Sequence, residues 1–276
     1  MPLIIQTNVS ALQAQKNLNV TQSALSVSFN KLSSGFRINS AKDDAAGLAI
    51  SESMKSQIRS YTVAERNAND GISMAQTAEG ALGEITAILG RMRELAMQGS
   101  NGSLTGDDRG YLDTEYAALK AEVQRIQDST KFNGKQMLAS TAATITFQVG
   151  LNATVSDQIS IEFGGLDLAA LVASTNTVAG STASASLAAL SVIDTALKTV
   201  STERAKYGAA MNRLENTTSN LQTIRLNLSA ANSRIRDVDV AEETATLSRS
   251  QVLSQAGAAI LAQANQAPQL AMGLLR

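Results

Sequence analysis

Residues 50–95 read ISESMKSQIRSYTVAERNANDGISMAQTAEGALGEITAILGRMREL. Within this stretch, apolar side chains recur at steps of three and four residues from Ile50 to Leu95. That spacing places them on one stripe of a helix, and the only prolines of the chain, Pro2 and Pro268, lie far outside it. About 55 residues of nearly continuous helix would be about 80 Å long. The stretch therefore predicts a rod, which is longer than any small globular domain.

A second rod of similar length is predicted for residues 187–236, where apolar residues recur with the same spacing. Between the two rods, residues 99–110 are dense in turn-forming residues and predict a loop. A helical stripe restarts in residues 112–126. Because the loop is short, we expect this helix to fold back antiparallel to the first rod.

The segment between the rods also contains a β pattern. Residues 131–134 predict a turn, and the alternating runs 145–149 and 158–163 predict two strands of a hairpin. Residues 164–186 are rich in Gly, Ala, Ser and Thr without a strong period, which favours an exposed connection. Residues 173–186 are rich in serine and threonine. Two interpretations of this composition are open: the segment accepts O-linked sugars, or it is simply a linker.

Both ends of the chain predict shorter helices. The first covers about residues 8–36, with apolar residues seven apart, and Ser-Ser-Gly at 33–35 is a plausible stop. The last follows a break at residues 236–239, where Asp-Val-Asp favours a hinge or cap over a calcium loop because the loop's glycine and distal glutamate are missing. Its stripe passes through Ala245, Val252, Leu253, Ala256, Ile260 and Ala264.

These elements predict a mainly α fold: a long antiparallel helical coiled-coil or bundle rod with a small distal β-hairpin region and paired N- and C-terminal helices. Three regions follow from the layout. Residues 1–44 and 237–276 form one, residues 45–140 and 187–236 form the second, and residues 141–186 form the distal hairpin and connection.

Few charges lie on the terminal helices, since Lys16 is the only charged residue among the first 30. An alanine-rich helix of this length gains too little from one buried stripe to offset its ordering entropy. We therefore expect both ends to be disordered in the isolated subunit and to fold on polymerisation. A closed monomeric bundle is the alternative. The residues expected to pack between subunits are Leu18, Leu25, Phe29, Leu32, Val252, Leu253, Ala256 and Ile260.

Composition excludes most enzymatic chemistry. The chain has no histidine and no cysteine, which removes the usual zinc sites, thiol nucleophiles, disulfides and Ser-His-Asp triads. The acidic pairs at 43–44, 107–108 and 242–243 are interpreted as helix starts or loop residues rather than acid and base pairs. No catalytic, cofactor-binding or metal-binding residue is predicted. Gly164-Gly165 and the isolated glycines at 80, 83 and 90 form no phosphate-binding fingerprint and are expected to permit close packing.

The net charge of -1 provides no general electrostatic reason to bind nucleic acid or anionic lipid. No apolar run reaches 18 residues, so no membrane span is expected. The N-terminus MPLIIQTNVS lacks the basic region and cleavage site of a Sec-type signal. Export by a route without a cleaved signal is not excluded by this test.

Several motifs resemble those of bacterial flagellins. Residues 32–50, LSSGFRINSAKDDAAGLAI, and residues 66–82, RNANDGISMAQTAEGAL, are similar to the N-terminal signatures of the family. Residues 248–257, SRSQVLSQAG, together with AQANQAP at 262–268 and the final Leu-Leu-Arg, are similar to its C-terminal end. The resemblance covers roughly the outer two thirds of the chain.

The resemblance implies a non-enzymatic, secreted filament subunit of the extracellular bacterial flagellum that serves swimming motility. It implies unfolded export through the flagellar type III apparatus, a chaperone on the C-terminal helix, and polymerisation under a cap beyond the hook-junction proteins. Residues 1–44 with 237–276 would line the central channel. Residues 45–140 with 187–236 would form the surrounding tube, and residues 141–186 replace the larger variable domains of other family members.

The motif Arg91-Met-Arg-Glu-Leu95, with Glu115 on the next helix, resembles the part of flagellins that vertebrate Toll-like receptors recognise. Arg91 and Leu95 are four residues apart and share a helix face, and folding back places Glu115 opposite Leu95. The alternative interpretation is that Leu95 is a core residue and the charges are solvated. Gly90 departs from the longer polar residue often found in the family.

Two other functions remain as alternatives. A hook-filament junction protein would share the design of the ends but match the quoted signatures less well. A coiled-coil type III export substrate that acts on membranes would need a strongly apolar segment, and the sequence contains none.

Overall fold

The computed structural model describes residues 7–273, and the side chains of residues 7–266. Helices dominate this part of the chain, and two small antiparallel sheets complete it. The chain divides into two compact units, residues 1–58 with 226–276 and residues 59–225. The predicted fold class is confirmed in its mainly α character, its small β-hairpin region and its paired terminal helices.

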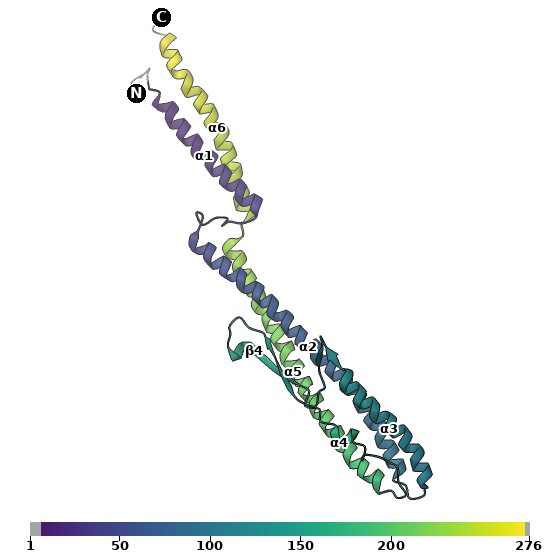
Figure 1. The fold of residues 1–276 in the computed structure, drawn as a ribbon. Coiled ribbons are helices and arrows are strands. Elements are labelled where there is room, and N and C mark those ends of the chain that lie inside the picture. The colour runs from purple at the N-terminus through teal and green to yellow at the C-terminus, as the bar shows by residue number, and fades with distance from the viewer. Residues whose placement is uncertain (1–6, 274–276) are drawn as a thin grey trace. The chain divides into compact units, whose positions relative to one another are not determined.

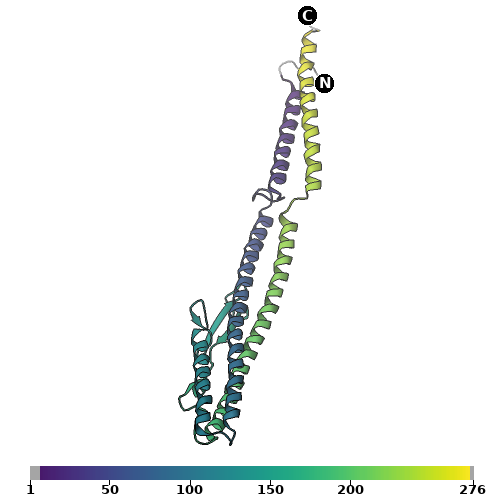
Figure 2. The same ribbon diagram turned by 90° about the vertical axis from the view of Figure 1, so that its right-hand side faces the viewer.

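The terminal helices α1 (Val9–Ser34) and α6 (Val240–Gly273) lie side by side (Figures 1 and 2). Asn8 caps α1, because its side-chain oxygen accepts a hydrogen bond from the Ala11 backbone at 3.1 Å. Gly35 ends the helix with a left-handed φ of 73°, as predicted from the Ser-Ser-Gly sequence.

The longest helix is α2 (Ala45–Gly99), whose 55 residues match the predicted rod. Asp44 begins it, since its carboxylate accepts a hydrogen bond from the Gly47 backbone at 2.9 Å. Asp43 accepts hydrogen bonds from the backbone N–H and the hydroxyl of Ser40 and from the backbone N–H of Asn39, and these bonds hold the pKa of Asp43 below its usual value. The acidic pair at 43–44 is therefore a helix start, as predicted.

Helix α3 (Gly106–Ser129) begins earlier than predicted, inside the expected loop 99–110. A capping box causes the early start: the Thr105 side chain accepts from the Asp108 backbone, and the Asp108 carboxylate accepts from the Thr105 backbone. The exposed charges and glycines of this segment resemble a loop in composition, but they are also compatible with a first helical turn.

Two hairpins follow α3, where the sequence predicts a turn at residues 131–134 and one hairpin. Strands β1 (Lys131–Phe132) and β2 (Lys135–Gln136) are joined by Asn133 and Gly134, which both have positive φ, at 48° and 79°. Strands β3 (Ala143–Gln148) and β4 (Gln158–Phe163) pair antiparallel with Ile145 opposite Ile161. A short 3-10 turn, η1 (Val155–Asp157), precedes β4.

The prediction that residues 164–186 form an exposed connection is wrong for part of the segment. It contains a short helix, α4 (Ala169–Val172), and its few large apolar residues are buried. Those residues are Leu166, Leu168, Leu171 and Val178. They are isolated among Gly, Ala, Ser and Thr, so that no period marks them in the sequence.

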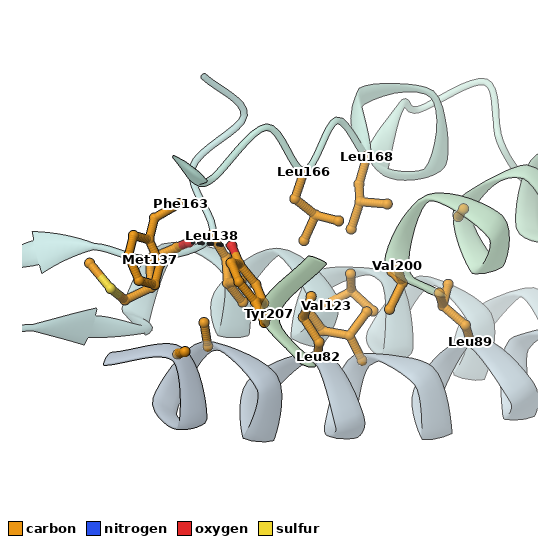
Figure 3. Close-up of a cluster of buried hydrophobic side chains, with 14 of the residues drawn as sticks. Leu82, Leu89, Val123, Met137, Leu138, Phe163, Leu166, Leu168, Val200 and Tyr207 are labelled. Atoms are coloured by element: carbon orange, nitrogen blue, oxygen red, sulfur yellow. Dashed lines mark hydrogen bonds between the residues drawn. The ribbon is translucent and has the colours of Figure 1, made fainter. Parts of the chain in front are cut away.

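The core of the unit 59–225 forms where α2, α3 and α5 (Ser184–Arg236) meet the strands and the connection (Figure 3). Tyr207 stacks on Phe163, with ring centroids 5.5 Å apart. Its hydroxyl accepts a hydrogen bond from the Gly164 backbone at 3.3 Å and donates to the Met137 carbonyl at 3.5 Å. Tyr207 thus connects α5 to both hairpin regions through hydrogen bonds.

The prediction that glycines permit close packing is confirmed at Gly164, where a Cβ would lie 2.6 Å from the Thr141 carbonyl oxygen, and it is wrong within the subunit for Gly80, Gly83 and Gly90. A Cβ atom at each of these positions would meet no heavy atom within 4 Å. Close approach occurs elsewhere in α2, at Gly71, where a Cβ would lie 3.3 Å from the Phe147 ring. The sequence does not distinguish the cases in α2, because these four glycines lie within one helical pattern.

Candidate assembly surface

The inner faces of α1 and α6 are lined mainly by small side chains at coiled-coil spacing. Leu18 lies over Gly257, where an added Cβ would meet the leucine at 3.3 Å. The half-buried or buried positions on α1 include Ala11, Ala14, Leu18, Thr21, Leu25, Ser28 and Leu32, and those on α6 include Leu247, Ser250, Ser254, Gly257, Leu261 and Ala264. Small residues at this seam allow the two helices to approach closely.

Two polar contacts fix the antiparallel register of this pair. At one end, the Asn8 side chain donates a hydrogen bond to the Ala264 carbonyl at 2.7 Å. Near the other end, Lys31 lies 3.8 Å from the Glu243 carboxylate. Together with the contact of Leu18 and Gly257, these pairs show one continuous register along the helices.

The outer faces of the pair expose large apolar side chains. Val252 is 64% exposed, Ile260 is 58% exposed and Phe29 is 53% exposed. The other large exposed apolar residues on the two helices are Val9, Leu12, Val20, Val27, Val240 and Leu253. Charges are sparse beside them: α1 contains Lys16 and Lys31, and the described α6 side chains include Glu242, Glu243 and Arg249. Such a surface is unusual for a helix pair that faces only water.

The residues expected to pack between subunits divide between the two faces. Three of them, Leu18, Leu25 and Leu32, are half-buried on the seam within one chain. The other five are exposed: Phe29, Val252, Leu253, Ala256 and Ile260. The strongest apolar stripe of α6 in the sequence thus faces outward, while serine and glycine at seven-residue spacing mark its inner face. Sequence reasoning missed the exposed residues Leu12, Val20 and Val27 of α1.

Hydrogen bonds join the two breaks in the helices, one between α1 and α2 and the other between α5 and α6. Arg37 donates from its backbone to the Arg236 carbonyl at 2.7 Å, and Val238 donates to the Gly35 carbonyl at 3.1 Å. The Arg236 guanidinium lies 4.5 Å from the centre of the Phe36 ring. Asp239 caps α6 by accepting from the Ala241 backbone at 2.9 Å, so that the predicted hinge-or-cap segment is a cap.

Arg91 and Glu115 of the receptor-like motif are brought together by the structure. The Arg91 guanidinium lies 2.8 Å from Glu115 and 2.9 Å from Glu94, and hydrogen bonds to these two carboxylates raise the pKa of Arg91. All three charged side chains are exposed. Leu95, in contrast, is 1% exposed and belongs to the core. A partner on this surface would therefore meet the charged pair and not the leucine.

Other kinds of site were sought in the same residues. Within the described part of the chain, no group of three or more Asp, Glu, His or Cys residues is arranged to hold a metal ion. None of the described helices combines the length and the apolar character required to cross a membrane.

Comparison with known proteins identifies both ends of the chain. Residues 5–143 match the bacterial flagellin N-terminal helical region, and residues 190–275 match the bacterial flagellin C-terminal helical region. A solved structure from Vibrio parahaemolyticus, described as a flagellar hook-associated protein, is 14% identical. It covers 71% of this chain and 100% of its own, with a TM-score of 0.61, and this likeness concerns the fold alone.

Relatives of nearly the same length are also similar throughout. A flagellin of Halalkalibacterium halodurans is 45% identical over 99% of this chain and 100% of its own length, and a flagellin of Bacillus subtilis is 43% identical over 99% of each. The flagellar filament 33 kDa core protein of Treponema phagedenis is 40% identical over 99% of this chain and 100% of its own. On this evidence the chain belongs to the bacterial flagellin family, whose members are structural subunits of the flagellar filament and not enzymes.

Proposed function

We propose that the pair of helices α1 and α6 drives polymerisation of this flagellin by burying its outer face against neighbouring copies. Family membership already implies a filament of identical subunits, and the filaments of the relatives are extracellular. We place this chain there too, as a subunit exported by the flagellar type III route. Residues 1–44 with 237–276 would line the channel, residues 45–140 with 187–236 would form the surrounding tube, and residues 141–186 would lie outermost.

One observation supports this proposal above the others: the terminal unit has almost no core of its own. Among the described side chains of residues 1–58 and 226–276, the buried apolar residues are Ala14 and Ile38. Nearly all of the large buried side chains belong to residues 59–225 instead. Ordering a residue costs about 1 to 2 kcal/mol in backbone entropy, which a seam of Ala, Ser and Gly offsets poorly.

The exposed residues of the outer face can supply the missing burial. Removing a Val, Leu, Ile or Phe side chain from water contributes about 1.5 to 3 kcal/mol. Phe29, Val252 and Ile260 are each more than half exposed, and several more such residues accompany them. Burial of this set between copies would therefore contribute on the order of 10 kcal/mol per subunit, which is enough to couple folding of the ends to assembly.

The proposal is tested by truncation and by one substitution. Deleting residues 1–30 or 245–276 should leave a soluble subunit that retains the folded unit 59–225 and does not elongate from filament seeds. Ile260→Asn should slow elongation strongly, whereas Gln263→Asn, which places the same side chain on the same helix at an already polar position, should elongate normally. Normal polymerisation of either truncated protein would refute the proposed mechanism.

The same outer face is a suitable place for an export chaperone. Val252, Leu253 and Ile260 would be exposed to water before assembly, and a chaperone on the C-terminal helix would cover them. The filament cap and the hook-junction proteins would meet the same helices at the two ends of the filament. Co-expression with the chaperone, followed by purification of the complex with wild-type or Ile260→Asn protein, measures whether this face is used.

A second candidate function is recognition by a vertebrate Toll-like receptor. The exposed Arg91 and Glu115 favour it, since they present a fixed charged pair on neighbouring helices. Reversing Glu115 to Lys should abolish receptor signalling by the monomer, while the same reversal at Glu122 on α3 should not. An unchanged signal in the Glu115→Lys protein would exclude this surface.

A further inference from the structure

Two Asn-Gly pairs occur in the chain, at residues 101–102 and 133–134. An asparagine followed by glycine loses its side-chain amide readily, because glycine has no Cβ to hinder attack by its own backbone nitrogen. Both pairs are exposed and lie in short connections of the unit 59–225. Their hydrogen-bond surroundings differ, and the difference concerns the atoms that take part in this reaction.

The side-chain carbonyl of Asn101 is polarised. Its oxygen accepts a hydrogen bond from the Ser103 backbone N–H at 3.1 Å, which folds the side chain over the peptide bond between Asn101 and Gly102. A nucleophile that attacks this carbonyl places negative charge on the same oxygen, and the Ser103 N–H is already aimed at it. The carbonyl therefore has a preformed donor of the kind that stabilises an oxyanion.

The peptide bond between Asn101 and Gly102 is polarised as well. The Arg109 guanidinium donates to the Asn101 main-chain carbonyl at 2.9 Å, and the Leu104 N–H donates to the same oxygen at 3.4 Å. Electron density drawn toward that oxygen makes the N–H of the same peptide more acidic, and a charged donor draws it most strongly. This N–H belongs to Gly102, and within residues 7–273 it donates no hydrogen bond. Its nitrogen is therefore both acidified and available.

Arg109 is held in place beside this peptide. Its side chain is 2% exposed, and its Nε atom donates to the Gly99 carbonyl at 2.8 Å, so that the guanidinium bridges both sides of the loop. Its hydrogen-bond acceptors are carbonyl oxygens, and in the described part of the chain it forms no ion pair. Around Gly102 the space is open, since a Cβ atom there would meet no heavy atom within 4 Å. Water can thus reach a peptide that a buried cation polarises.

Asn133 lacks these contacts. It occupies the tight turn between β1 and β2 with a φ of 48°. Its side-chain oxygen accepts no hydrogen bond from the described residues, and no arginine among them donates to its main-chain carbonyl. The two pairs thus share the sequence that favours loss of the amide, but only the pair at 101–102 has the donors that would accelerate it.

We propose that Asn101 is a self-modification site, at which the subunit converts its own side-chain amide to a carboxylate with water as the only co-reactant. The Gly102 nitrogen gives its proton to solvent and bonds to the Asn101 Cγ atom. The bond from Cγ to Nδ2 then breaks, and Nδ2 takes a proton from solvent and leaves as ammonia. Water opens the resulting cyclic imide at one of its two carbonyl carbons. Opening at Cγ leaves an aspartate, and opening at the main-chain carbon leaves an isoaspartate, in which the chain runs through the former side chain.

Arg109 also favours one of the two products. The main-chain carbonyl that it polarises is the one that water attacks to form isoaspartate, and this attack turns the carbonyl into a free carboxylate. The buried guanidinium then has an anionic acceptor in place of a neutral one, and a bond of that kind is stronger. Either product adds one negative charge to a chain whose net charge is -1. The proposal is independent of polymerisation, because every contact on which it rests lies within one subunit.

Mass spectrometry of peptides from the complete folded subunit, incubated at mildly alkaline pH, measures conversion at both pairs in one sample. The matched control is the same chain unfolded in urea, where the local sequence alone sets the rates. Asn101 should convert about tenfold faster in the folded subunit than in urea, since one hydrogen bond that strengthens in the transition state contributes about that factor. Folding should not accelerate Asn133. Conversion of Asn101 that is no faster in the folded subunit than in urea would overturn the proposal.

Hydrogen exchange of the Gly102 amide tests the acidity separately. Exchange that is faster in the folded subunit than in urea reports a more acidic N–H, because a loosened loop can at most reach the rate of the unfolded chain. Slower exchange of this amide in the folded subunit would contradict the polarisation.

Replacement of Arg109 assigns the effect to its guanidinium. Arg109→Met should return conversion at Asn101, the isoaspartate fraction and exchange at Gly102 to the values in urea, and leave Asn133 unchanged. The control Arg125→Lys, on an exposed part of the same helix, should alter none of these. A folded Arg109→Met subunit that converts Asn101 as fast as the wild type would refute the role of Arg109. If this variant does not fold, the comparisons of the wild type in buffer and in urea decide the question.

Discussion

At the scale of single residues, the two buried tyrosines differ in how their hydroxyl groups are satisfied. The Tyr207 hydroxyl bonds to the Gly164 N–H and the Met137 carbonyl, whereas the buried Tyr116 hydroxyl has no hydrogen-bond partner within the described residues. Tyr207→Phe should lower the free energy of unfolding by about 1 to 2 kcal/mol, because it leaves a buried N–H unpaired. Tyr116→Phe should change it by less than about 0.5 kcal/mol. Urea unfolding of both variants, followed by circular dichroism, measures the difference, and equal losses would contradict it.

The same two residues predict how stability depends on alkaline pH. Burial raises the pKa of both Tyr207 and Tyr116 to about 12. An unfolded chain releases these protons near pH 10, so that only the unfolded state gains from deprotonation between pH 10 and 12. The free energy of unfolding should therefore be unaffected by these groups below pH 10 and fall by about 2 to 3 kcal/mol per tyrosine between pH 10 and 12.

Tyrosine-to-phenylalanine replacement at both positions isolates this effect. The double variant should lose the part of the alkaline destabilisation that belongs to Tyr116 and Tyr207, when both proteins are unfolded in urea at pH 9 and at pH 11.5. An alkaline loss as large as that of the wild type would show that other groups are responsible.

At the scale of elements, replacing a glycine by alanine should have opposite effects on stability in a helix and in a turn. Gly80 lies in α2 with open space where a Cβ would stand, so that Gly80→Ala should raise the free energy of unfolding by about 0.5 to 1 kcal/mol. Gly164 has a φ of +86°, and a Cβ there would lie 2.6 Å from the Thr141 carbonyl oxygen. Gly164→Ala should therefore cost at least about 2 kcal/mol. Thermal unfolding should move in opposite directions for the two proteins, and a destabilised Gly80→Ala subunit would refute the assignment of open space.

Hydrophobic periodicity predicts the long elements well and the contacts of small residues poorly. The boundaries of α2 follow from the spacing of its large apolar residues and from the acidic start at Asp43 and Asp44. The inner face of α6 does not follow, because Ser250, Ser254 and Gly257 have no hydrophobic contrast with their neighbours. Steric fit at the seam orients this helix, and steric fit depends on the partner helix.

Isolated apolar residues and local capping are the other features that periodicity misses. Leu166 and Leu171 are buried although their neighbours have the composition of a linker. The early start of α3 depends on one hydrogen-bonded pair, Thr105 and Asp108. Among the candidate assembly residues, Phe29 and Ile260 are exposed, which agrees with contacts between subunits. Which of the candidate residues a neighbouring subunit contacts depends on how subunits pack in the filament, so this part stays a prediction.

At the scale of the whole molecule, the two compact units differ in how their stability would arise. The unit 59–225 encloses large buried side chains from α2, α3, α5 and the strands, and these are sufficient for an independent core. The other unit buries two apolar side chains among those described and exposes many more. Its stability should therefore depend on the concentration of other copies, in the way that obligate oligomers lose stability on dilution.

Hydrogen exchange of the complete chain tests this difference directly. In a dilute solution of subunits, backbone amides of α2, α3 and α5 within residues 59–225 should be protected, while those of α1 and α6 should exchange close to the rate of an unfolded peptide. In filaments, both terminal helices should become protected by a factor of about 100 or more. The unit 59–225 serves as an internal reference in each sample. Because the expected protection comes from neighbouring copies, slow exchange of α1 and α6 in the dilute subunit would show that the pair is stable alone, and that burial between subunits is not what folds it.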